Sequence, residues 1–151
     1  MRPRFMGRLG VADVFTTVNA GLGFIAVVTA VFDPHLAARI ILLASIADGL
    51  DGILATRLNG SEVGPYLDSL ADVASFCVAP AFLVVTVTRN VGLFGDPTYR
   101  YVIVAVGAIF VAMGVMRLAL YTAYDTEDKS TEGVPSTLAG TILAVAVLAG
   151  V

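Results

Sequence analysis

The chain has 151 residues, of which 58% are hydrophobic and only 14% are charged, and its formal net charge is −3. Soluble domains usually carry roughly 25% charged residues, so this composition excludes an ordinary soluble domain and favours apolar helices in a membrane. The negative charge argues against a nucleic-acid partner, and the single cysteine excludes an internal disulfide and a zinc–cysteine cluster.

Five apolar segments follow one another along the chain, separated by short polar joints. We expect membrane-spanning helices at 14–32, 36–58, 65–88, 101–121 and 135–151, since a span needs roughly 20 apolar residues. The last segment is shorter and has no polar flank, so we expect an incomplete final span in a truncated chain. The sequence therefore predicts an all-α, polytopic membrane helix bundle that forms one domain over residues 1–151.

Positively charged residues favour one orientation of this bundle, because lysine and arginine near span ends prefer the cytoplasmic side of a membrane. With the N-terminus inside, the cytoplasmic set is Arg2, Arg4, Arg8, Arg57, Arg117 and Lys129, and the smaller outer set is Arg39, Arg89 and Arg100. This orientation places the joint between the second and third segments in the cytoplasm of a multi-pass cell-membrane protein.

Four aspartates lie inside the apolar segments, where an unpaired charge costs at least about 2.5–3.5 kcal/mol. Asp48 and Asp51 stand near the end of the second segment, and Asp68 and Asp72 stand near the start of the third. Because the joint between these segments is short, the two helices must run antiparallel. We therefore expect the four acids to meet at one depth, near the cytoplasmic surface.

Each pair of acids shares a helix stripe with small residues. At about 100° per residue, the acids of the second segment lie beside Gly52 and Ala55, and those of the third lie on a stripe with Gly64. Small residues let a flat group approach the backbone closely. We expect these three residues to line the wall of a polar cavity that accepts a nucleotide diphosphate.

Four carboxylates that face one another cannot all stay ionised without a counter-charge. Ligands that are all oxygens, with no histidine or cysteine nearby, suit Mg²⁺, Mn²⁺ or Ca²⁺ better than Zn²⁺ or copper. Two such ions would balance four carboxylates, and a pair about 3.5–4 Å apart is used to hold a phosphate during in-line displacement. The sequence therefore predicts a two-metal site for phosphoryl transfer.

Small residues also line one face of the fourth segment, at Gly107, Ala108, Ala112 and Gly114. Such a face suits close packing against another helix. We expect a homodimer, and this face is one possible seam for it.

The acidic region resembles the signature of the CDP-alcohol phosphatidyltransferase family, D-x2-D-G-x2-A-R-x8-G-x3-D-x3-D. Residues 64–72 match its second half without a gap. In the first half, Thr56 stands where the family has arginine and Arg57 follows it. The family resemblance extends to its serine-specific members, including archaeal archaetidylserine synthases, because residues 67–81 resemble their LDSLADxxSFGVAPA stretch, with Cys77 in place of glycine. Residues 16–23 resemble their TxxNxxxG motif, and residues 133–140 resemble their GLPTPAAG motif.

The resemblance implies an enzyme that transfers a lipid-phosphate group from a CDP-lipid to the hydroxyl of L-serine and releases CMP. Two Mg²⁺ or Mn²⁺ ions would be held by Asp48, Asp51, Asp68 and Asp72, with Asp72 also acting as the base. Substrate contacts would come from Asp13, Thr16, Gly52, Arg57 and Ser61, together with the wall residues Ala55 and Gly64. Arg117 would hold a substrate phosphate or the serine carboxylate.

Other interpretations remain open for the function and for single residues. The same chemistry could use glycerol phosphate or inositol phosphate as acceptor, and intramembrane acids also mark divalent-cation transporters. Asp13 could simply stabilise the start of a helix. Arg57 and Arg117 could extend to lipid headgroups without binding substrate.

Overall fold

The computed structural model describes residues 10–57, 61–124 and 136–150, and it contains helices and no strand in these ranges. The helices are α1 (Val11–Ala30), α2 (Pro34–Arg57), α3 (Gly64–Asp72), α4 (Ala79–Asn90), α5 (Pro97–Ala123) and α6 (Ser136–Ala149). A π-helical stretch at Val73–Val78, here called the π turn, joins α3 to α4, and a short 3₁₀ helix (Leu93–Gly95) precedes α5. The predicted all-α helix bundle is confirmed.

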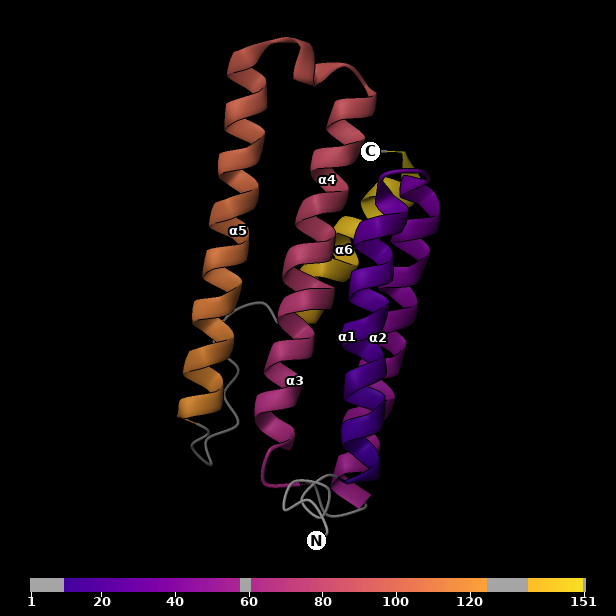
Figure 1. The fold of residues 1–151 in the computed structure, drawn as a ribbon, viewed down its shortest axis with the longest axis vertical. Coiled ribbons are helices and arrows are strands. Elements are labelled where there is room, and N and C mark those ends of the chain that lie inside the picture. The colour runs from indigo at the N-terminus through magenta and orange to yellow at the C-terminus, as the bar shows by residue number, and fades with distance from the viewer. Residues whose placement is uncertain (1–9, 58–60, 125–135, 151) are drawn as a thin grey trace, which may run out of the picture.

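Three helical stretches are long and apolar enough to cross a membrane: Asp13–Ala30, Gly64–Asn90 and Pro97–Ala123. The second of these is the continuous rod formed by α3, the π turn and α4 (Figure 1). Helix α2 has 24 residues, which is enough to cross, but it carries acidic residues near its end. Helix α6 has only 14 residues, short of the roughly 20 that a perpendicular span needs.

Helix α5 begins four residues earlier than the expected boundary at 101, because Asp96 caps it. The Asp96 side chain accepts a hydrogen bond from the Thr98 backbone N–H at 2.7 Å, and Pro97 occupies the first turn. An aspartate followed by proline is a common helix start. The sequence therefore contained this signal, but hydropathy alone placed the boundary too late.

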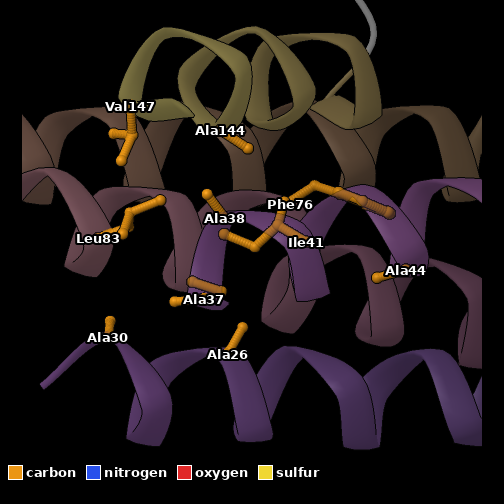
Figure 2. Close-up of a cluster of buried hydrophobic side chains, with 11 residues drawn as sticks. Ala26, Ala30, Ala37, Ala38, Ile41, Ala44, Phe76, Leu83, Ala144 and Val147 are labelled. Atoms are coloured by element: carbon orange, nitrogen blue, oxygen red, sulfur yellow. The ribbon is translucent and has the colours of Figure 1, made fainter. Parts of the chain in front are cut away.

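The helices pack around a core made largely of alanine. Helices α1, α2, α4 and α6 and the π turn contribute to one buried cluster, whose residues are labelled in Figure 2 except Ala79: Ala26, Ala30, Ala37, Ala38, Ile41, Ala44, Phe76, Ala79, Leu83, Ala144 and Val147. Small side chains let helix backbones approach closely, which is how membrane helices gain packing energy. Helix α5 stands at the outer side of the bundle (Figure 1), and its membrane-crossing window is 0% buried.

The glycines of α5 face inward. A Cβ at Gly107 would lie within 4 Å of α4 side chains, and a Cβ at Gly114 would clash with Cys77 of the π turn. The two glycines of this small-residue face therefore pack inside the chain, whereas Ala108 and Ala112 are exposed. The expected homodimer and its possible seam on α5 stay predictions.

The π turn is surrounded by glycines from three other helices. Gly23 of α1, Gly114 of α5 and Gly140 of α6 all face it. A Cβ at Gly23 would lie 2.9 Å from two backbone atoms of the π turn, and a Cβ at Gly140 would lie 3.0 Å from one of its carbonyl oxygens. A π-helical turn is wider than an α-helical one and is frequently found at functional sites. Gly23 and Gly140 make room for this wider backbone directly after Asp72, and Gly114 makes room for the Cys77 side chain.

We expect Gly23→Ala to destabilise the protein by at least about 1–3 kcal/mol, because its Cβ would overlap backbone that cannot move aside. Gly21→Ala is the matched control on the same helix, since a Cβ there meets nothing within 4 Å. Thermal unfolding of both variants in detergent measures the difference. Equal unfolding midpoints for the two variants would contradict this prediction, because they would show that the π-turn backbone shifts to accommodate the added Cβ.

Candidate active site

Three acids from two helices meet at one end of the bundle. Asp48 lies near the end of α2, while Asp68 and Asp72 lie on successive turns of α3. One carboxylate oxygen of each lies within 4.8 Å of the others. Asp72 is buried, Asp48 is half-buried and Asp68 is exposed. The expected meeting of acids is therefore found for these three, while the side chain of Asp51 lies outside the described part of α2.

The two carboxylate oxygens of Asp72 differ in their hydrogen bonding. Its Oδ2 accepts a hydrogen bond from the Ser136 hydroxyl at 3.5 Å. Its Oδ1 is buried and has no hydrogen-bond partner among the described residues, although the side chain is only 8% exposed. A buried carboxylate oxygen without a partner is expensive, so Oδ1 is suited to a cation or a proton donor brought by substrate.

The donor set of the cluster fits a hard divalent cation. Every candidate ligand atom in this group is a carboxylate oxygen, which Mg²⁺, Mn²⁺ and Ca²⁺ prefer. The Oδ1 of Asp72 offers a ligand position that no group in the described part of the chain fills. The described residues at this site are therefore chemically suited to a metal ion.

A second polar group lies at the start of α1. The Asp13 carboxylate accepts a 2.6 Å hydrogen bond from the Gly10 backbone N–H, so it caps its own helix as the simpler interpretation predicted. A Cβ at Gly64 would lie 3.4 Å from both Asp13 Oδ1 and Ser61 Oγ. Ser61 Oγ is buried without a described partner, and Thr16 is only 4% exposed.

The two polar groups are connected along α3. Gly64, Asp68 and Asp72 are spaced four residues apart, so Gly64 lies about 12 Å before Asp72 at about 1.5 Å per residue. One helix face therefore runs from the group at Asp13 and Ser61 to the acid cluster. The structure brings together these expected substrate contacts on one side of α3.

The remaining expected site residues lie on α2 and α5. Arg117 lies on α5, and its guanidinium carbon is 5.0 Å from the centroid of the Tyr121 ring, at cation–π distance. Gly52, Ala55 and Arg57 belong to the last turns of α2, but their side chains lie outside the described part of the structure. Their assignments stay predictions.

Hydroxyl groups around the acids were missed by sequence reasoning. Thr137 Oγ1 donates to Asp48 Oδ2 at 3.3 Å, and Ser136 donates to Asp72 as described above. Ser69, next to Asp68, shares a short hydrogen bond with Thr122 of α5. The only sequence signal was the motif over 133–140, which indicated a family relationship but not these contacts.

Comparison with known proteins gives one consistent result. The family model described as CDP-alcohol phosphatidyltransferase matches residues 9–151. An archaetidylserine synthase of Methanothermobacter thermautotrophicus is 29% identical over 94% of this chain and 59% of its own length. A CDP-diacylglycerol–serine O-phosphatidyltransferase of Helicobacter pylori is 35% identical over 90% of this chain and 56% of its own length.

A yeast relative of the same name, from Saccharomyces cerevisiae, is 35% identical over 86% of this chain and 50% of its own length. The chain thus spans between 50% and 59% of the length of these curated relatives. No solved structure matches the chain significantly.

Proposed function

The chain belongs to the CDP-alcohol phosphatidyltransferase family, and from this membership we propose that it transfers a lipid-phosphate group from a CDP-activated lipid to the hydroxyl of L-serine, with release of CMP. The observation that carries the proposal is the cluster of three carboxylates within 4.8 Å at the junction of α2 and α3. The serine acceptor is supported by the names of the curated relatives.

We propose that Asp48, Asp68 and Asp72 hold two Mg²⁺ or Mn²⁺ ions, together with Asp51, which the resemblance adds to the set. Bound there, the ions would neutralise the charge that develops on the pyrophosphate as its bond breaks. The all-oxygen donor set and the unpartnered Oδ1 of Asp72 support this assignment.

Asp72 is proposed as the general base, because its Oδ1 is buried and has no hydrogen-bond partner among the described residues. The serine oxygen forms a bond to the phosphorus that carries the lipid, and the bond from this phosphorus to the CMP oxygen breaks. The hydroxyl proton passes to Asp72. A hydroxyl is a weak nucleophile until a base removes its proton, and a positioned base typically contributes about 10²–10⁴-fold.

We propose that the CDP-lipid binds along the face of α3 that runs from the polar group at the start of α1 to the acid cluster. The described residues of this face are Asp13, Thr16, Ser61 and Gly64. The Ser61 hydroxyl is buried and has no described hydrogen-bond partner, so it can bind the CDP-lipid. We also propose that Gly52, Ala55 and Arg57 contact the CDP-lipid. Arg117 is proposed to bind a substrate phosphate or the carboxylate of serine. The arginine and lysine pattern supports a cytoplasmic orientation of this face in the cell membrane.

The position of the acids disfavours a cation transporter. Asp68 and Asp72 lie within the first nine residues of the rod Gly64–Asn90, whereas transport requires carboxylates that both membrane faces can reach. Metal-dependent release of CMP by purified protein in detergent would support the enzyme. Cation flux into liposomes without CDP-lipid would support the transporter.

The proposal predicts that purified protein, supplied with CDP-lipid and Mg²⁺ or Mn²⁺, transfers radiolabel from L-serine into lipid. Glycerol phosphate and inositol phosphate are the comparison acceptors, and each carries a phosphate that needs additional positive charge in the site. We expect serine to be the preferred acceptor. Preference for either phosphorylated acceptor would leave the transfer chemistry intact and reject serine.

A further inference from the structure

The first two residues of α6 reach carboxylates on two different helices. Ser136 Oγ donates to Asp72 Oδ2 of α3 at 3.5 Å, and Thr137 Oγ1 donates to Asp48 Oδ2 of α2 at 3.3 Å. Both contacts use the Oδ2 atom of the acid. Helix α6 therefore bridges the two helices that supply the acid cluster.

Packing fixes α6 in this position. Gly140, one turn after the hydroxyl pair, lies so close to the π turn that a Cβ would be 3.0 Å from a backbone oxygen. Ala144 and Val147 of the same helix are buried in the core cluster (Figure 2). Because α6 is held along its length, the hydroxyls at its start have little freedom to move away from the acids.

A second hydroxyl contact joins α6 to α2 without touching a carboxylate. Thr141 Oγ1 donates to Ser45 Oγ at 3.1 Å, one helical turn from the contact between Thr137 and Asp48. The same pair of helices thus offers two threonine contacts, of which only one reaches the acid cluster. This pair provides an internal control for the role of the carboxylate contact.

We propose that Ser136 and Thr137 are positioning residues that hold the Oδ2 atoms of Asp72 and Asp48, so that the opposite oxygen of Asp72 is presented to the metal ion and the substrate hydroxyl. This inference rests on the proposed function, since it assumes that the acids bind metal. When one carboxylate oxygen accepts a fixed hydrogen bond, the carboxylate cannot rotate freely. Its other oxygen therefore stays in place. Removal of such outer partners typically lowers metal affinity by about 10- to 100-fold.

The test is a direct Mn²⁺ binding titration, followed by electron paramagnetic resonance, on the full chain in detergent without CDP-lipid or serine. Thr137→Val keeps the side-chain shape and removes the hydroxyl, and we expect its Mn²⁺ Kd to rise about tenfold or more. Thr137→Ser keeps the hydroxyl and should bind nearly as the parent does. Thr141→Val, the matched control, should leave the Kd unchanged.

Ser136→Ala extends the test to Asp72, and Ser136→Thr is its rescue variant. Weaker binding in both hydroxyl-deleted variants, with recovery in Ser136→Thr and Thr137→Ser, is the expected result. Unchanged Kd in Thr137→Val, or an equal loss in Thr141→Val, would overturn the positioning role. A parent protein that binds no Mn²⁺ would instead reject the metal site on which the proposed function itself depends.

Discussion

Asp72→Asn is expected to lower serine transfer by at least about 10²–10⁴-fold, the usual contribution of a general base. An amide has almost the same shape as the carboxylate, but it cannot take the proton from the serine hydroxyl and it is a poor ligand for a hard cation. The loss should appear in kcat, measured as radiolabelled serine incorporated at saturating CDP-lipid. Affinity for CDP-lipid should change less, because its described proposed contacts lie at the start of α3, in the joint before it and on α1.

The control for this variant is Asp96→Asn. Asp96 caps α5 at the opposite end of the α3–α4 rod from the acid cluster, and asparagine also caps helices well. We expect this variant to retain near-parental transfer. Near-parental turnover by Asp72→Asn itself would remove Asp72 from the role of base and leave the acid cluster as a metal site only.

Removal of divalent cations is expected to abolish transfer completely. Three carboxylate oxygens within 4.8 Å repel one another unless a cation lies between them, and the ions are proposed to neutralise the charge that develops on the pyrophosphate. Activity should disappear in excess EDTA and return when Mg²⁺ or Mn²⁺ is added beyond the chelator. Far-ultraviolet circular dichroism in EDTA checks that the helices persist. Full transfer in excess chelator would contradict the two-metal proposal.

The spacing of residues along single helices predicted much of this site. Asp68 and Asp72 lie four residues apart on a helix, and the short joint to α2 requires that Asp48 lie opposite them. These inferences need only helical periodicity and chain connectivity. The all-α fold followed in the same way, from the length and hydropathy of the segments.

Contacts between distant segments could not be read from local patterns. The bonds from α6 to the acids join residues 64 and 89 positions apart in the sequence, and nothing in the local composition of Ser136 and Thr137 indicates which helix they face. The π turn also depends on contacts between segments that are distant in the sequence. Gly23 and Gly140 accommodate its wider backbone and Gly114 accommodates its Cys77 side chain. Because these glycines lie on three other helices, the stability of the π turn depends on tertiary packing more than on its own six residues.

The π turn also determines the relative rotation of the two halves of its helix. Each residue of a helix turns the chain by about 100°, so the number of residues between Asp72 and Ala79 decides which way α4 faces once the acids point into the site. Deleting one residue from Val73–Val78 while the remaining residues keep their winding would rotate α4 by about a quarter turn relative to the acids. Leu83 would then leave the core, or Asp72 would leave the cluster. This segment should therefore tolerate changes of side chain far better than any change in its length.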